Sequence, residues 1–250
     1  MNIDWHARFT QQAVWTKSLR TYLLKEIDLQ SYTSILEIGC GTGAVLSDFT
    51  SAENISLHGL DINYQYCAIA TRSSRSSIIV NADLYTTPYP AGSFDLVFCH
   101  YLFLWLAFPG LAMEEVFRIL KPSGGFLIFA EPDYESRIDF PSEFASLGKE
   151  QTKSLVKQGV NPRIGRSLPS LASQAGFIEC KYGISGYETF AGELPTWWES
   201  EWQTIRYDLA ETLLSNELDV LMEKDRKSWL NGSRVLWIPT FYLSCRKPPE

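Results

Sequence analysis

Short, continuously apolar segments alternate with helical segments over the first half of this chain, and this alternation constrains the fold more than any other feature. Strands of this kind are buried on both faces, which is typical of a parallel sheet covered by helices on two sides. The predicted strands are residues 34–38, 55–60, 77–81, 94–99 and 126–130, and the predicted helices are residues 10–24, 44–50, 64–73 and 111–120. The sequence therefore predicts an α/β fold with a mostly parallel sheet.

The second half of the chain is less regular. It is predicted to contain a helix at 168–175, a strand or hairpin arm at 177–190, a long helical stretch at 197–230 and a final strand at 234–246. We find no repeat, low-complexity segment or linker that would separate independent domains. We therefore expect a single domain over residues 1–250, with a core from about 25–132, 165–190 and 233–247 and a cap from about 133–164 and 191–232.

Composition restricts the partners and the compartment. A net charge of −7 gives no general attraction to nucleic acid. The five cysteines show no C-x-x-C spacing, so neither a disulfide framework nor a zinc site is expected, and a reducing cytoplasm suits them. The N-terminus lacks an apolar signal-peptide run, and the most apolar stretch, 96–109, is too short to span a bilayer. We expect a soluble cytoplasmic protein with no membrane partner.

A glycine cluster, Gly39-Cys40-Gly41-Thr42-Gly43, follows the first predicted strand. Glycines at such a turn let the backbone bend sharply and let a ligand approach closely. Asp61 lies 20 residues after Gly41, at the end of the next strand. The two strand ends are neighbours in a right-handed βαβ unit, so this carboxylate is placed to accept hydrogen bonds from ribose hydroxyls.

The cluster alone leaves the type of nucleotide ligand open. Gly39, Gly41 and Ala44 also satisfy the dinucleotide pattern G-x-G-x-x-A. Three details favour another ligand: Glu37 stands two residues before the first glycine, Gly43 extends the run to G-x-G-x-G, and a further acidic residue, Asp83, follows the third strand.

With these motifs, residues 34–131 resemble the class I methyltransferases that depend on S-adenosylmethionine (SAM), of the small-molecule type. The motifs that carry the resemblance are Glu37-Ile38-Gly39-Cys40-Gly41-Thr42-Gly43, Asp61, Ala82-Asp83-Leu84, Phe94-Asp95-Leu96-Val97 and Arg118-Ile119-Leu120-Lys121-Pro122-Ser123-Gly124-Gly125. The resemblance implies SAM as cofactor. It also implies a Rossmann-like, seven-stranded, mostly parallel sheet with helices on both faces and a largely helical substrate cap.

The resemblance implies a role for each residue at the methionine and ribose end of SAM. Gly39 and Gly41 would let the methionine part pass over the loop, and Asp61 would bind the ribose hydroxyls. Glu37 would either hold the loop by hydrogen bonds or contact the ligand directly. His100, directly after the fourth strand, would contact the methionine part, act as a base toward the acceptor, or only cap the strand end.

At the adenine end, the resemblance assigns three residues. Ile62 would pack on the adenine face, Asp83 would accept a hydrogen bond from the adenine amino group, and the Leu84 backbone N–H would reach a ring nitrogen. In similar enzymes a helix before the first strand folds over the cofactor, so Arg8 or Trp15 could touch the methionine end, as could Gln12. For any one of these three, simple helix packing is an equally good interpretation.

The sequence favours a metal-independent methyltransferase that acts on a small-molecule acceptor. No acidic pair follows the fourth strand, where metal-dependent catechol methyltransferases carry one. The tryptophans of the cap segment 191–232 suit an aromatic acceptor, although each one also suits ordinary core packing. Three alternatives stay open: an NAD-dependent oxidoreductase, a non-catalytic SAM-binding protein, and a methyltransferase with a protein or RNA acceptor.

Overall fold

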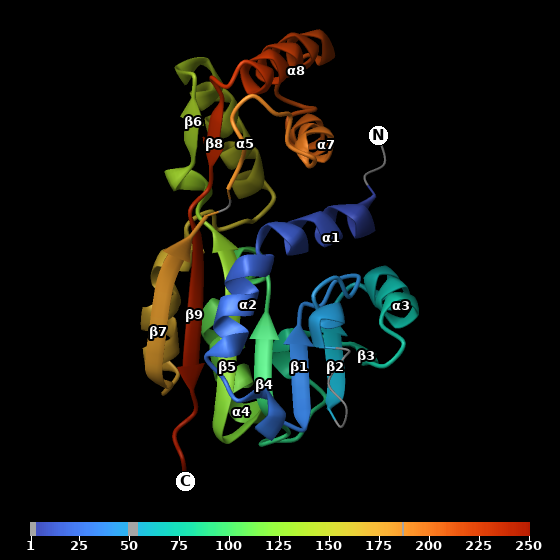
Figure 1. The fold of residues 1–250 in the computed structure, drawn as a ribbon. Helices are drawn as coiled ribbons and strands as arrows, with labels where there is room; N and C mark the ends of the chain where they lie inside the picture. The colour runs from blue at the N-terminus through green and yellow to red at the C-terminus, as the bar shows by residue number, and fades with distance from the viewer. Residues whose placement is uncertain (1–3, 50–54, 187) are drawn as a thin grey trace.

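A computed structural model describes residues 4–49, 55–186 and 188–250, and its centre is a seven-stranded sheet (Figure 1). The strand order is β3-β2-β1-β4-β5-β9-β7. The bounds are β1 Ser34–Ile38, β2 Ser56–Asp61, β3 Ile78–Asn81, β4 Phe94–Cys99, β5 Leu120–Pro132, β7 Ile178–Ser185 and β9 Thr240–Arg246. Only β9 runs antiparallel to its neighbours, so the predicted Rossmann-like, mostly parallel fold is confirmed.

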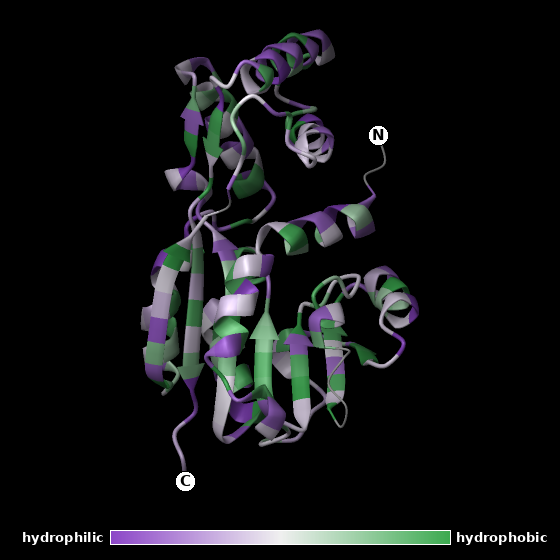
Figure 2. Cartoon of the chain, in the orientation of Figure 1, coloured by the Kyte–Doolittle hydropathy of each residue, from purple (hydrophilic) through white to green (hydrophobic). Residues whose placement is uncertain are grey.

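The central strands are apolar throughout because successive side chains enter two separate cores. On one face, residues such as Leu36 and Val97 pack against α4 (Pro109–Ile119) and α6 (Leu168–Gln174). On the other face, their chain neighbours pack against α2 (Lys17–Lys25). Figure 2 shows the hydrophobic residues that run through these strands.

The helix predicted at 44–50 is wrong for its described part. Residues 44–49 form turns and a short 3-10 turn, Leu46–Phe49, and residue 50 lies outside the described residues. Phe49 is buried and stacks on Phe98 of β4, with ring centroids 4.6 Å apart. A segment this short forms few i to i−4 hydrogen bonds, so packing of its apolar side chains against the sheet decides its shape.

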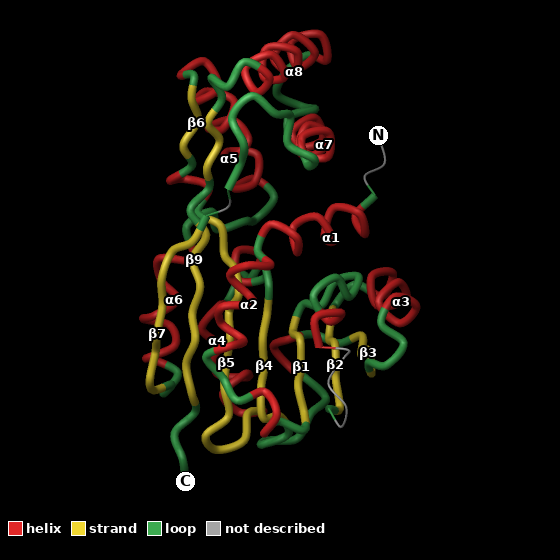
Figure 3. The backbone as a smooth tube through the Cα atoms, viewed as in Figure 1, coloured by secondary structure: helices red, strands yellow, loops and turns green. Residues whose placement is uncertain are grey.

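The helix predicted at 10–24 is divided into α1 (Trp5–Trp15) and α2 at Thr16. Arg20 causes part of this break, because its guanidinium donates to the Ala13 carbonyl at 2.5 Å and to Thr16 Oγ1 at 2.6 Å. These bonds satisfy backbone and side-chain acceptors at the junction, where the regular helical pattern ends. As a result α1 crosses above the carboxyl ends of the strands, whereas α2 lies along the sheet (Figures 1 and 3).

Helix α3 (Tyr64–Ser73) packs beside β2 and β3, and a cap stands beyond the carboxyl ends of the strands (Figure 1). The cap is built from α5 (Ala145–Lys157), α7 (Trp198–Asp208), α8 (Ser215–Leu230) and the antiparallel pair β6 (Ile138–Phe140) and β8 (Val235–Trp237). The predicted stretch 197–230 is therefore two helices, and the predicted strand 234–246 is divided near Pro239 into β8 and β9. Proline cannot donate a ladder hydrogen bond, which favours the division there.

The cap has its own hydrophobic core. Four tryptophans of the cap segment are buried in it: Trp197, Trp198, Trp202 and Trp229. The Asp225 carboxylate accepts hydrogen bonds from the indole N–H groups of Trp198 (2.6 Å) and Trp202 (2.9 Å). Of these four, only Trp197 also lines a cavity, so packing explains most of the tryptophan content. In the described residues, no helix combines the length and apolarity that crossing a membrane requires.

Candidate active site

The glycine cluster forms a tight turn at the carboxyl end of β1. Gly39 and Gly41 have φ values of +66° and +51°, a region that penalises any side chain with a Cβ. A Cβ added to Gly39 would lie 2.6 Å from Leu102 Cδ1, and one on Gly41 would lie 3.2 Å from the Phe9 ring. Both positions therefore favour glycine for conformation, and a side chain at either one would displace Leu102 or Phe9.

Asp61 lies against this turn, as its position in the sequence predicted. One carboxylate oxygen accepts from the Gly41 N–H at 2.8 Å, and the other accepts from the Asn63 N–H at 2.8 Å. Each oxygen has capacity for a further donor. Burial raises the pKa of this carboxyl group, while the two backbone N–H bonds lower it. The acid thus fastens the loop of β1 to the end of β2 and still presents acceptor atoms.

The residues predicted to bind adenine follow the carboxyl ends of β2 and β3. Asp61 is paired with Asn81 across β2 and β3, so Asp83 follows two residues after this rung. Asp83 Oδ1 accepts from the Tyr85 N–H at 2.9 Å. Ile62 is 72% exposed, an unusual position for isoleucine, whereas the Leu84 side chain is buried. The structure places an exposed apolar surface and a carboxylate on the same edge.

The carboxylate of Glu37 is buried near this edge of the sheet. Its side chain is buried beneath the loop, and Oε2 has no hydrogen-bond partner among the described residues. Burial raises the pKa of this carboxyl group well above its usual range, and the nearby Arg20 only partly opposes that effect. A buried acceptor without a donor is costly, so a bound group that donates a hydrogen bond here would be stabilised.

His100 is fixed by the break between α1 and α2. Its Nε2 lies 2.8 Å from Thr16 Oγ1, and its ring stacks on Tyr101 with centroids 4.3 Å apart. Burial, and secondarily the charge of Arg20, lowers the pKa of His100 to about 3. The imidazole is therefore neutral at physiological pH and weakly basic, which argues against the predicted base role and leaves contact with the methionine part or capping of β4.

The depressed pKa of His100 predicts a pH-dependent stability. A folded-state pKa of about 3, below the unfolded value of about 6.5, stabilises the protein fully above pH 6.5, and this stability is lost as the pH falls toward 3. Wild type should lose about 1–2 kcal/mol more unfolding free energy between pH 7 and pH 5 than His100→Asn, after a discount for partial exposure. Urea unfolding of both proteins at each pH measures this difference, and equal losses would contradict a histidine that stays neutral in the folded protein.

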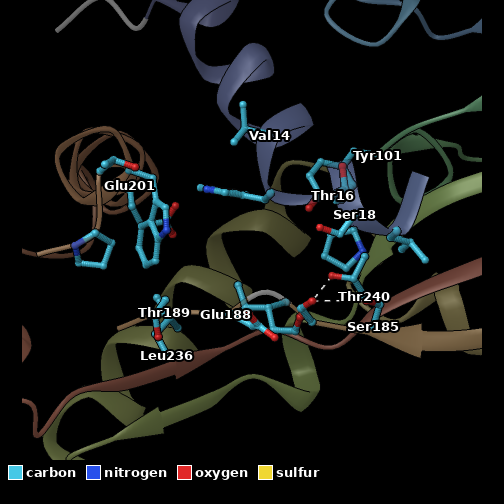
Figure 4. A pocket seen from close by; sticks show the side chains of 18 of the residues that line it. Val14, Thr16, Ser18, Tyr101, Ser185, Glu188, Thr189, Glu201, Leu236 and Thr240 are labelled. Atoms are coloured by element: carbon cyan, nitrogen blue, oxygen red, sulfur yellow. Dashed lines mark hydrogen bonds between the residues drawn. The ribbon is translucent and has the colours of Figure 1, made fainter. Parts of the chain in front are cut away.

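A cavity of about 640 Å³ lies next to this edge, between the sheet and the cap (Figure 4). It is lined by residues from α1, the start of α2, the segment after β4, the ends of β5 and β7, residues 188–197 and the β8–β9 connection. The glycine loop, Asp61 and Asp83 do not line it. Helix α1 borders both regions, because Phe9 contacts the glycine loop while Val14 and Trp15 face the cavity.

Arg8 connects α1 to the cap. Its guanidinium forms a buried ion pair with Glu201 of α7, at 2.7 Å, and lies 4.8 Å from the centre of the Trp15 ring. Arg8 and Trp15, two of the candidate ligand contacts, thus help to hold α1 in place. Glu201 carries no sequence motif, and its partner is 193 residues away, so sequence patterns did not identify this pair.

Glu131, at the end of β5, is a further residue of this region that no sequence motif indicated. Its carboxylate accepts hydrogen bonds from three successive backbone N–H groups, those of Leu102 (2.9 Å), Phe103 (2.8 Å) and Leu104 (3.1 Å). It thereby orders the segment after β4, in which Tyr101 adopts a φ of +53°. Burial raises the pKa of Glu131 to about 7. The available signal was an acidic residue in an otherwise apolar strand.

All five cysteine thiols are free. Across residues 4–49, 55–186 and 188–250, no group of three or more His, Cys, Asp or Glu side chains is arranged to hold a metal ion.

Comparisons with known proteins agree with this geometry. A family described as a methyltransferase domain matches residues 36–128. An uncharacterised protein of transposon TN4556 from Streptomyces fradiae is 32% identical over 180 residues, 68% of this chain and 51% of its own length. An uncharacterised methyltransferase of Schizosaccharomyces pombe is 26% identical over 211 residues, 79% of this chain and 73% of its own. This chain thus spans about half the length of the first relative.

The fold also has solved counterparts. A SAM-dependent methyltransferase from Thermotoga maritima superposes with a TM-score of 0.60 at 17% identity, covering 97% of this chain and 94% of its own. At this identity the match describes the fold alone. It covers the sheet and the cap together, beyond the stretch that the family matches.

Proposed function

We infer that this chain, which contains a class I SAM-dependent methyltransferase domain, transfers the methyl group of SAM to a small-molecule acceptor without the help of a metal ion. The observation that carries this proposal is the glycine turn bound to Asp61, with a separate cavity beside it. SAM would lie along the turn, and the acceptor would occupy the cavity. The segments 133–164 and 191–232 would then act as the acceptor cap.

The residues at the turn fit SAM chemically. Glu37 Oε2, buried and without a donor, suits the ammonium of the methionine part. Gly39 and Gly41 give the turn its positive φ angles without side chains of their own, and Asp61 retains acceptor capacity for two ribose hydroxyls. His100 is proposed to contact the methionine part or to cap β4, because a base with a pKa of about 3 would be ineffective.

When bound, SAM supplies a methyl group that its sulfonium has already activated. The chain's own task is to orient the acceptor in line with the C–S bond and to exclude water. Helix α1 suits the second task, because it covers the glycine turn and borders the cavity. Glu131 suits the first, because it holds the segment that carries Tyr101 at the cavity wall.

Titration calorimetry with SAM, S-adenosylhomocysteine and NAD tests the donor. We expect SAM and S-adenosylhomocysteine to bind and NAD not to bind, since an α-helix does not follow the glycine turn directly to receive a pyrophosphate. Binding of NAD without SAM would favour the oxidoreductase instead. Methyl transfer from labelled SAM to a panel of small molecules, protein and RNA then tests the acceptor class, and transfer to none of them would favour a non-catalytic SAM-binding protein.

We predict a graded effect at Asp83. If its free carboxylate oxygen accepts from the adenine amino group, Asp83→Ala should weaken SAM binding by about 1–2 kcal/mol. Asp83→Asn should lose less, because the amide can present its oxygen in the same place. Calorimetry on both variants gives the comparison, and wild-type affinity in Asp83→Ala would remove this residue from the site.

A cytoplasmic location and the absence of a nucleic-acid partner are part of the same proposal. The free state of all five thiols and the net charge of −7 support them.

A further inference from the structure

The walls of the cavity are aromatic. Five large rings border it: Trp15, Tyr101, Tyr134, Phe190 and Trp197. They come from α1, from the segments after β4 and β5, and from the loop 188–197. Aromatic faces bind flat apolar groups, and they also attract cations through the negative potential of the ring face.

The charge that the cavity presents to a ligand is negative. Arg8 is the only basic residue in the described lining, and the buried ion pair with Glu201 neutralises it. Two further carboxylates, Glu188 and Glu193, line the cavity where it is exposed to solvent, and neither forms an ion pair with a described residue. Figure 4 shows Glu188 on the floor of the cavity, opposite Val14 of α1. An anionic acceptor would therefore meet uncompensated negative charge, whereas a cation would be attracted.

A hydroxyl acceptor would need a base to remove its proton. The titratable side chains around Tyr101 do not suit this task. The carboxylate of Glu131, with a pKa of about 7, is buried and already accepts hydrogen bonds from three backbone N–H groups. The pKa of His100 is about 3, and burial raises the pKa of Tyr134 to about 12. Effective general bases have pKa values near the operating pH. A neutral amine attacks through the free lone pair of its nitrogen and does not need such a base.

We propose that the cavity binds an amine with an aromatic or apolar body, and that its nitrogen receives the methyl group. The proposal rests on the proposed function, because it names the acceptor of the same site. The ammonium form is attracted by Glu188 and Glu193, and the body lies among the aromatic rings. The amine reacts in its neutral form, after its proton has passed to water.

The transfer step balances without a further reactant. The nitrogen lone pair forms the new N–C bond while the C–S bond of the methyl group breaks. The electron pair of that bond stays on sulfur, which becomes the neutral thioether of S-adenosylhomocysteine. The positive charge moves to nitrogen, and a secondary or primary amine then releases its surplus proton to water.

Calorimetry with three probes of one shape tests the charge preference. Tryptamine, tryptophol and indole-3-propionate share an indole body and carry an ammonium, a hydroxyl and a carboxylate. They are titrated into the protein saturated with S-adenosylhomocysteine, whose own binding is measured first and reports on the proposed function separately. We expect tryptamine to bind about tenfold more tightly than indole-3-propionate, with tryptophol between them.

Charge variants identify the source of the preference. The double variant Glu188→Gln/Glu193→Gln should weaken tryptamine binding about fivefold and leave tryptophol unchanged. Glu199→Gln is the matched control, because Glu199 is exposed on α7 and does not line the cavity. The proposal is overturned if indole-3-propionate binds as tightly as tryptamine, if the double variant retains the full preference, or if S-adenosylhomocysteine binds but tryptamine does not.

Discussion

The Gly41→Val variant should bind SAM at least about a hundredfold more weakly than the wild type while it remains folded. Gly41 has a φ of +51°, which a β-branched residue adopts only with strain. A Cβ there would lie 3.2 Å from two atoms of the Phe9 ring, before the two methyl groups of valine are added. Either the turn must change shape or α1 must move away from it, and both changes remove the surface along which SAM would lie.

A matched control separates the site from backbone strain. Gly92 has a φ of +68° in the turn before β4, and a Cβ there would meet no atom within 4 Å. Gly92→Val therefore carries a similar strain away from the site and should bind SAM as the wild type does. Calorimetry and thermal unfolding of both variants give the result. A SAM affinity of Gly41→Val within a few-fold of the wild type would mean that the ligand does not approach this turn.

Asp61→Ala should weaken SAM binding by about 1–3 kcal/mol, because two ribose hydroxyls lose a charged acceptor. The loss includes a second contribution, since the same carboxylate holds the N–H groups of Gly41 and Asn63. The turn should become less ordered in the free variant. Titration with SAM and with S-adenosylhomocysteine should show equal losses, because the two molecules carry the same ribose.

Asp95→Ala is the control for the effect of removing a bonded carboxylate. Asp95 accepts from the backbone N–H groups of Thr33 and Ser34 and pairs with Lys121, at the amino end of the strands. Its removal should lower the unfolding free energy without changing SAM affinity. An Asp61→Ala variant that folds and binds SAM normally would exclude Asp61 from the ribose site.

Local features of the chain explain what the sequence could predict. Gly39 and Gly41 are needed because their own φ angles are positive. Asp61 is placed by the length of one strand and one connection, which brings the ends of β1 and β2 together. Properties of this kind depend on a few consecutive residues and on the handedness of parallel β-units, so they can be read from one chain.

The points at which the predicted helices are interrupted are set by tertiary contacts. The segment 44–49 resembles a helix, yet Phe49 is drawn onto Phe98 of a strand 49 residues later. The helix predicted at 10–24 ends at Thr16, where Arg20 and His100 both contact the threonine hydroxyl. Local propensity favours a continuous helix by only fractions of a kcal/mol per residue, so tertiary contacts of this size override it.

Strand periodicity and positive φ angles are properties of short segments, so the parallel sheet, the glycine turn and the acid beside it follow from local sequence. The packing of distant segments places His100 against Thr16, lets Glu131 order the segment after β4, and pairs Arg8 with Glu201. It also decided the shape and the charge of the cavity. The physical reason is that burial and pairing set a side chain's charge, and the partners responsible stand up to 193 residues apart in the chain.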